Sequence, residues 1–226
     1  MLPARIEALK RVGLIPAFIV KRATLVWRLA GRQSLHTFHR DPWSEAVMAI
    51  EASIPLLEEI LGGWKQQIGE DYAAYRNHVC RMVHYCFALH DCNEEERRKI
   101  VIAGCFHDIG IWSDGTIDYL PPSVVRAREY LQGNGLSAWD EEIALMIDQH
   151  HKLRSWRDAR YPLVEVFRKA DLVDVSLGLV RFGLPANLVG EVKAQFPNQG
   201  FHKRLMQLAG SWFAGHPLSP PPFLKW

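Results

Sequence analysis

The sequence predicts an all-α protein, and three observations support this fold class. Apolar residues recur with helical spacing over most of the chain, whereas segments with the alternating pattern of a β-strand are scarce. Proline and glycine stand at positions where helices begin and end. The composition is that of a globular protein, with 48% hydrophobic and 23% charged residues. A chain of 226 residues is long enough for one compact helical bundle with terminal extensions.

The helices predicted in the first half of the chain end at glycine or start at a capping motif. The first covers about 43–62 and ends at the Gly62-Gly63 pair. The second covers about 70–91. An Asn-x-x-Glu capping box followed by acidic residues then starts a third helix over 93–110.

In the second half, proline opens helices and a glycine-rich turn closes one of them. Pro121-Pro122 start a helix that ends at the Gly133-Asn134-Gly135 turn, and Pro162 lies in the first turn of a later helix. These predicted helices cover about 121–133, 139–151, 162–180 and, as a shorter pair, 186–195 and 201–214.

Net charge and cysteine content restrict the class of partner. A formal charge of +2 is too small to indicate a nucleic acid polymer. The four cysteines include no Cys-x-x-Cys pair, which is typical of reduced, buried thiols and not of a disulfide framework. We recognise no secretory signal and expect a cytoplasmic protein.

The stretch 12–30 is apolar, but Lys21, Arg22 and Arg28 interrupt it and Pro16 lies within it. A membrane-spanning helix needs about 20 apolar residues with few charges, so we do not expect this stretch to cross a membrane. Contact with a membrane surface is an alternative. The favoured interpretation is a helix packed on its own domain.

Histidine and aspartate are expected on the inward faces of four helices. His78, His107 and His150 each continue the apolar stripe of a helix. Asp108 follows His107, and Asp171 lies in the apolar run LVEVFRKADLVDV. Buried carboxylates are paired or bind metal, because an unpaired buried charge costs several kcal/mol. A divalent ion would neutralise the aspartates while using neutral imidazoles, and the set does not distinguish Mn, Fe, Co, Ni, Zn and Mg.

The motifs around these residues resemble the HD-domain superfamily of metal-dependent phosphohydrolases. They are YRNHVCR with His78, AGCFHDIG with His107 and Asp108, and KADLVD with Asp171. The resemblance covers about 70–180 and implies a helical bundle in which these four residues are metal ligands. It also implies hydrolysis of phosphoesters or nucleotides by a metal-activated water. A minority of the superfamily instead bind two irons and oxidise small molecules.

The number of ions is a separate question. The pair His150-His151 resembles a histidine pair that superfamily members with two or more metals use. Those members place a further histidine between the His-Asp pair and this pair, and the present sequence has none from Asp108 to His150. Ala74 stands where three-metal relatives carry an acid. We therefore expect one divalent ion, with two as the alternative. His150 and His151 are expected either to bind metal or to contact the phosphate or the leaving group of the substrate.

Two further aspartates are candidates for supporting roles. Asp114 lies in the loop after Asp108, where a general acid or base would be placed. An aspartate beside Gly115 is equally expected for turn formation. Asp174, one turn after Asp171 and on the same face, is the alternative metal ligand at this position. We favour Asp171 as the ligand and expect Asp174 to accept a hydrogen bond from a ligand imidazole. The catalytic candidates are thus Asp108, Asp114, His150 and His151.

Arg81, Lys152 and Lys169 flank the ligands in sequence and are candidates for binding a small anionic substrate. The leading hypothesis is hydrolysis of a small phosphorylated metabolite or nucleotide. The alternatives are a di-iron oxygenase on the same fold and a non-catalytic binding or regulatory module. A homo-oligomer is compatible with each of them.

The resemblance also suggests a division of the chain. We expect an N-terminal helical extension over 1–65 and an HD-type metal-binding helical domain over 66–182. C-terminal helices and a proline-rich tail over 183–226 are expected to pack on that same domain.

Overall fold

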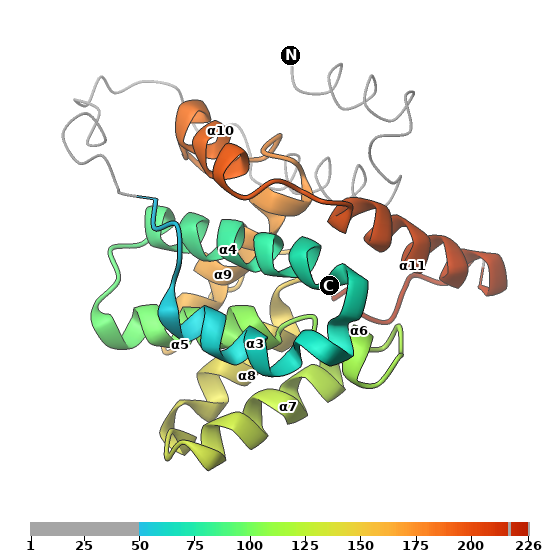
Figure 1. Cartoon of the computed structure of the whole chain (residues 1–226), viewed down its shortest axis with the longest axis horizontal. Helices are drawn as coiled ribbons and strands as arrows, with labels where there is room; N and C mark the ends of the chain where they lie inside the picture. Colours follow the sequence, from blue (N-terminus) through green and yellow to red (C-terminus); the bar gives the residue numbers. More distant parts are fainter. Residues whose placement is uncertain (1–49, 217, 226) are drawn as a thin grey trace.

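The computed structural model describes residues 50–216 and 218–225, and this part of the chain is all-helical, which confirms the fold class (Figure 1). The stretch 12–30, for which we favour a helix packed on its own domain over contact with a membrane surface, lies outside the described residues. The helices are α3 (Pro55–Ile68), α4 (Tyr72–Leu89), α5 (Glu94–Phe106), α6 (Gly110–Ser113), α7 (Leu120–Gly133), α8 (Asp140–Gln149), α9 (Pro162–Val175), α10 (Ala186–Gln195) and α11 (Phe201–Gly215). The described residues contain no strand, only one isolated bridge between Lys152 and Lys225.

Local capping signals explain where several helices begin. The backbone N–H of Glu96 donates to Asn93 Oδ1 at 3.0 Å, and the backbone N–H of Asn93 donates to Glu96 Oε2 at 2.9 Å. This confirms the capping box at the start of α5. Proline occupies the first turn of α3, α7 and α9, where its missing N–H removes no helical hydrogen bond.

The first described helix differs from the prediction at both ends. Residues 50–54 are not helical, and α3 starts at Pro55; the part of the prediction before residue 50 lies outside the described residues. The helix also continues through Gly62 and Gly63, each of which costs about 1 kcal/mol relative to alanine. Burial of Leu57 and Leu61, both fully covered, outweighs this cost.

Two other helix ends were also predicted in the wrong place. Helix α9 ends at Val175 because Leu177 and Gly178 have positive φ angles of 56° and 79°. The backbone N–H of Gly178 then donates to the carbonyl of Val173 at 2.8 Å, which closes the helix. Gly110 starts the short helix α6, whereas α5 has already ended at Phe106.

Helices α4, α5 and α9 form the centre of the molecule. In Figure 1, α10 and α11 lie at one edge and α7 and α8 at the opposite edge. Helix α4 contacts α3, α5, α9, α10 and α11, and α8 contacts α5, α7 and α9. One continuous apolar core extends from Ile54 to Phe201, so it crosses both expected segment boundaries, near residues 65 and 182.

Within the described residues, no helix has both the length and the apolar character that a membrane span requires.

Candidate metal centre

Six buried histidine and aspartate side chains meet between α4, α5, α8 and α9. They are His78 of α4, His107 and Asp108 after α5, His150 and His151 after α8, and Asp171 of α9. Their possible ligand atoms fall into overlapping groups, within each of which all atoms lie within 4.8 Å of one another. These groups are His78-His107-Asp108, His107-His150-Asp171 and Asp108-His150-His151. The structure therefore brings the four predicted ligands and the His150-His151 pair into one cluster.

Gly104 allows α5 to approach α4 closely. A Cβ atom at this position would lie 3.2 Å from Val83 and 3.3 Å from Val79, closer than ordinary van der Waals contact. The absence of a side chain therefore lets the two helices pack closely. This packing places His107, directly after α5, beside His78 in the middle of α4.

The imidazoles of His107 and His150 are held in the same way. The Nδ1–H of His107 donates to the Gly104 carbonyl at 2.7 Å, and the Nδ1–H of His150 donates to the Ile147 carbonyl at 2.7 Å. Each carbonyl belongs to the last turn of the preceding helix, where no helical N–H is left to bind it. These bonds fix the tautomer, so each Nε2 atom faces the cluster with its lone pair.

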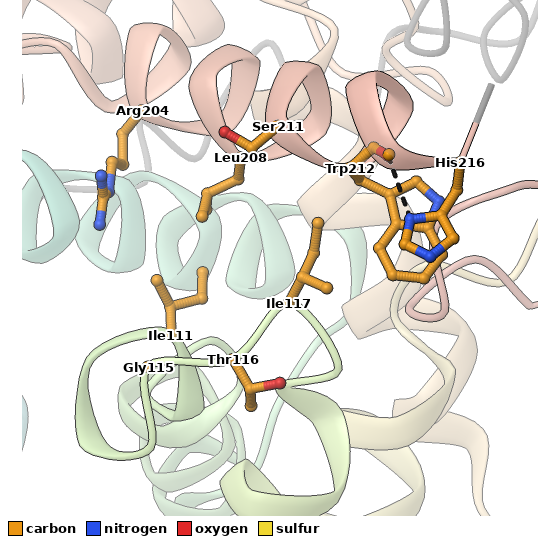
Figure 2. A pocket seen from close by; sticks show the side chains of 10 residues that line it. Ile111, Gly115, Thr116, Ile117, Arg204, Leu208, Ser211, Trp212 and His216 are labelled. Atoms are coloured by element: carbon orange, nitrogen blue, oxygen red, sulfur yellow. Dashed lines mark hydrogen bonds between the residues drawn. The ribbon is translucent and has the colours of Figure 1, made fainter.

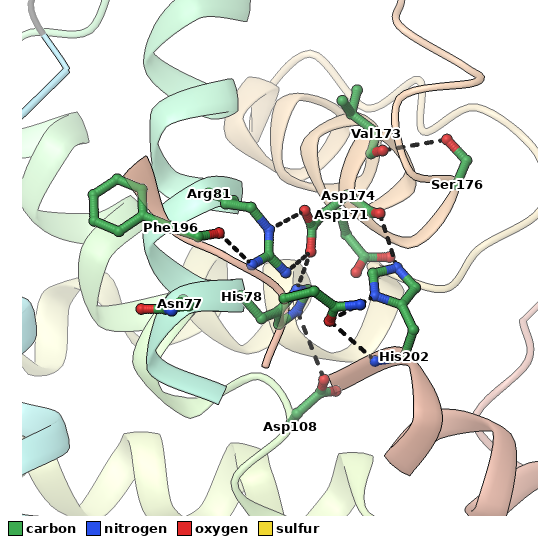
Figure 3. A network of polar contacts seen from close by, with 12 residues as sticks. Asn77, His78, Arg81, Asp108, Asp171, Val173, Asp174, Ser176, Phe196 and His202 are labelled. Carbon is green, nitrogen blue, oxygen red and sulfur yellow. Dashed lines mark hydrogen bonds and ion pairs between the residues drawn. The ribbon is translucent and has the colours of Figure 1, made fainter. Parts of the chain in front are cut away.

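His78 is oriented by a carboxylate (Figure 3). Its Nδ1–H donates to Asp174 Oδ2 at 2.6 Å, as expected for Asp174. Arg81 holds the same carboxylate through its Nε and Nη2 groups at 2.5 and 2.7 Å and donates from Nη1 to the Phe196 carbonyl at 2.9 Å. His202 donates from Nε2 to the backbone carbonyl of Asp174 at 3.2 Å. Burial raises the pKa of Asp174, but the charges and hydrogen bonds of Arg81 and His78 together outweigh burial and lower this pKa well below the usual range.

This network corrects the expectation that Arg81 binds substrate. Its guanidinium is 2% exposed and is bound to Asp174 and Phe196 behind His78. Arg81 therefore supports the orientation of His78 and does not face an open site.

The spacing of the inward-facing atoms suits a bound divalent ion. His78 Nε2 lies 3.0 Å from His107 Nε2, and His107 Nε2 lies 3.2 Å from Asp108 Oδ2. His150 Nε2 lies 3.4 Å from Asp108 Oδ1. Ligand bonds of about 2.1 Å separate adjacent ligand atoms by about 3.0–3.4 Å. Asp108 Oδ1 is buried and has no hydrogen-bond partner among the described residues. A bound cation would compensate for this unpaired oxygen.

Electrostatics also favour a cation at this position. Two imidazole lone pairs that face each other at 3.0 Å repel unless a proton or a metal ion lies between them. Burial lowers the pKa of His78 more than Asp174 raises it. For His107, burial also lowers the pKa, but Asp108, Asp171 and the hydrogen bond to Gly104 together outweigh burial and raise the pKa overall. Burial raises the pKa of Asp108, but the neighbouring His107 and His150 lower it well below its usual range. Asp108 therefore stays ionised and needs positive charge beside it.

His151 has a different environment. Its Nε2 atom lies 2.7 Å from the Tyr119 hydroxyl, and its Nδ1 atom lies 3.7 Å from Asp171 Oδ2. Both Tyr119 and Asp171 are about 1% exposed. His151 is therefore placed between a hydroxyl and a carboxylate, where it can hold or pass on a proton.

Aromatic residues from the C-terminal part of the chain cover the cluster. Phe201 of α11 stacks on His78 with a centroid separation of 3.9 Å and an angle of 14°. Phe223, in the proline-rich tail, lies 5.1 Å from the His151 ring and is 5% exposed. The carbonyl of Lys225 accepts a hydrogen bond from the backbone N–H of Leu153 at 2.9 Å, which holds the tail there. The sequence motifs gave no signal for Phe201 or Phe223, because both reach the cluster only through long-range packing.

The remaining predicted site residues lie away from the cluster or at its edge. Asp114 is on the surface, where Arg126 approaches it at 3.3 Å. Lys169 is 36% exposed and lies near Glu165 at 3.8 Å. Asp114 and Lys169 therefore lie outside the buried cluster, and the roles expected for them in catalysis and in substrate binding stay predictions. Lys152 directly follows His151 and is half-buried, so it stays a candidate for substrate binding.

A cavity of about 330 Å³ lies between α11 and the loop after α6 (Figure 2). Ile111 lines this cavity, and the backbone N–H of Ile111 donates to the Asp108 carbonyl at 3.0 Å. Arg204 lies at one end of the cavity and the Trp212-His216 pair at the other. The cavity thus has an apolar middle with polar groups at both ends, one helical turn away from Asp108.

Comparisons with protein-family models, with curated proteins and with solved structures found no match to this chain. The buried histidine and aspartate groups have the donor types, the orientation and the spacing to hold a metal ion.

Proposed function

We propose that this protein is a metal-dependent phosphohydrolase of the HD type. The observation that carries the proposal is the convergence of the His78, His107 and His150 Nε2 atoms beside Asp108, while each Nδ1 is bound elsewhere. Imidazoles that are only packed in a core would not need a common orientation. The order of the motifs and their resemblance to HD-domain proteins support the same assignment.

In the proposed site, His78, His107, Asp108 and Asp171 hold one divalent ion. A bound ion of this kind acidifies water and stabilises negative charge on a phosphoryl group. Asp174 keeps the His78 lone pair directed inward, and the carbonyls of Gly104 and Ile147 do the same for the other imidazoles. The chain thus supplies a preorganised site whose groups need little movement during the reaction.

His151 is the proposed proton donor for the leaving group. It contacts Tyr119 on one side and approaches Asp171 on the other, so it can be held as an imidazolium that releases a proton. Lys152, directly after it, is the proposed contact for the anionic part of the substrate.

The closed surface of the cluster limits the substrate to a small molecule. None of the six side chains is more than 6% exposed, so the substrate enters only when a cover moves. The tail around Phe223 is the proposed cover, because it packs over His151 and is not part of any helix. The cavity beside Ile111 offers space for the organic part of the substrate.

The test is reconstitution with single metals. The protein is stripped with a chelator, reloaded with Mn²⁺, Co²⁺, Ni²⁺ or Mg²⁺, and assayed on nucleotides and generic phosphomonoesters and phosphodiesters. We expect turnover with at least one ion, loss of turnover in Asp108→Ala, and full turnover in the control Asp140→Ala. Asp140 is a surface aspartate that pairs with Arg128 at 2.8 Å. Absence of turnover with every ion, or equal turnover by Asp108→Ala, would contradict the proposal.

One observation favours a second candidate, an oxygen-activating enzyme with two irons. His150 and His151 both reach the cluster, so six side chains are close enough to share two ions. Metal analysis of protein produced with iron separates the two candidates. Two irons per chain together with oxygen consumption would favour the oxygenase, and one ion per chain with phosphoester turnover would exclude it.

A further inference from the structure

A second group of metal-binding side chains lies in the turn that joins α4 to α5. It consists of His90, Cys92 and Glu96, whose ligand atoms lie within 4.8 Å of one another. The His90 and Glu96 side chains are 32% and 24% exposed, so the group is open to solvent. It is distinct from the buried cluster, whose members include no cysteine.

The geometry of this turn holds the ligand atoms in place before any ion binds. Glu96 Oε2 accepts the Asn93 N–H at 2.9 Å as part of the capping box of α5. That bond directs the other oxygen, Oε1, to within 3.4 Å of His90 Nε2. The Cys92 thiol donates to the His90 carbonyl at 3.3 Å, so it lies on the same turn. Little side-chain entropy is therefore lost when the three groups bind a common ion.

We propose that His90 Nε2, Cys92 Sγ and Glu96 Oε1 form a surface site for a zinc-like divalent ion. Zinc accepts mixed sets of imidazole, thiolate and carboxylate ligands, and a water molecule would supply the fourth ligand. Hard ions such as Mg²⁺ are disfavoured, because they prefer oxygen ligands.

The charge around the site suits a cation. Asp91 lies between His90 and Cys92, and Glu96 contributes a second carboxylate. The Arg97 guanidinium pairs with Glu51 and lies over the Phe87 ring at 3.8 Å. Metal binding replaces the thiol proton by the ion and releases this proton to solvent.

The thiol is protonated at neutral pH when no ion is bound. Burial and the Glu96 carboxylate raise the pKa of Cys92 to about 11. An ion that binds at this site must therefore displace the thiol proton.

The position of the site gives it a structural consequence. Helix α4 carries His78, and α5 leads directly to His107. An ion at the junction ties the end of α4 to the start of α5. It therefore stabilises the helix pair on which the buried cluster is built.

Cobalt substitution tests the site in the full-length protein. Cobalt bound by a thiolate gives an intense charge-transfer band in the near ultraviolet, which cobalt bound only by imidazole and carboxylate does not give. The other cysteines, at 80, 86 and 105, are buried. We expect the band in the unmodified protein and in Asp108→Ala, and its loss in Cys92→Ser. A missing band, or a band that persists in Cys92→Ser, would overturn the proposal.

Two further measurements do not depend on that variant. Glu96→Gln keeps a side chain that can complete the capping box but removes the anionic ligand, and we expect about tenfold weaker cobalt binding with unchanged helix content. Zn²⁺ is expected to slow alkylation of Cys92 in the unmodified protein. An unchanged alkylation rate at saturating Zn²⁺ would contradict the site even if the buried cluster proves to be catalytic. Phosphohydrolase activity is not a readout in any of these experiments, so their outcome is independent of the proposed function.

Discussion

Replacement of Asp174 by alanine is expected to destabilise the protein even in the absence of metal. Arg81 donates to both oxygens of Asp174, at 2.5 and 2.7 Å, and the two side chains are no more than 3% exposed. Removal of one member of a buried ion pair costs about 3–5 kcal/mol, because the other charge is left buried without a partner. A typical domain is stable by about 5–15 kcal/mol, so this loss is readily measured.

The same substitution is expected to weaken metal binding. In the unmodified protein, the hydrogen bond from His78 Nδ1–H to Asp174 Oδ2, at 2.6 Å, fixes the tautomer and orientation of the imidazole. The alanine variant lacks this acceptor. Loss of such a partner weakens metal binding about 10- to 100-fold, which corresponds to about 1.4–2.7 kcal/mol. Asp174→Asn keeps a carbonyl oxygen for this bond but not the negative charge. We therefore expect this variant to bind metal better than Asp174→Ala while it loses much of the same stability.

The assay has two stages. Urea unfolding of the chelated protein, followed by circular dichroism, gives the change in the free energy of unfolding without metal. Calorimetric titration with Mn²⁺ then gives the change in affinity. The matched control is Asp140→Ala, which removes an exposed ion pair with Arg128 and is expected to cost less than about 1 kcal/mol. If Asp174→Ala is no less stable than this control, the inference that Asp174 neutralises a buried charge is wrong.

Three other predictions concern backbone packing, the C-terminal cover and pH. Gly110→Ala is expected to lower the free energy of unfolding by about 1–3 kcal/mol, because a Cβ atom would overlap the backbone and side chains at the start of α7. Gly62→Ala places its Cβ atom in open space and is expected to raise the free energy of unfolding by up to about 1 kcal/mol. Thermal unfolding of the two variants measures both changes. Phe223→Ala is expected to open the cluster and accelerate metal removal by a chelator, measured by stopped flow; an unchanged rate would show that the tail is not the cover. Burial lowers the pKa of three histidines, His78, His84 and His202, and only His107 has a raised pKa among the buried histidines with a resolved shift, so the unfolded state is expected to bind more protons near and below pH 6.5. The stability of the chelated protein is therefore expected to fall between pH 7 and pH 5, as urea midpoints would show, and a constant midpoint would contradict this.

Short-range signals explain what could be predicted of the fold. A capping box and proline in the first turn act within a few residues, and the corresponding starts of α5, α7 and α9 lie where they were expected. The glycine pair at 62–63 was misleading for a physical reason. Its cost of about 1 kcal/mol per residue is smaller than the gain from burying the apolar face of α3, which depends on the tertiary fold.

The candidate site could be predicted only in part. The sequence placed His78, His107-Asp108 and Asp171 on inward helix faces, and the structure brings them together. The role of Arg81 could not be predicted from its position near His78, because its partner Asp174 lies 93 residues away in sequence. The contact of the tail with His151 is likewise a long-range contact, which no local motif encodes.

One hydrogen-bond arrangement links helix termination to the chemistry of the cluster. Helices α5 and α8 each end one residue before an imidazole, His107 or His150, whose Nδ1–H binds a carbonyl of the last turn at 2.7 Å. These carbonyls would otherwise be buried without a helical partner. The bond that satisfies the helix end is therefore the bond that directs Nε2 into the cluster. Because helix geometry fixes the carbonyl, the ligand orientation is present before any ion binds.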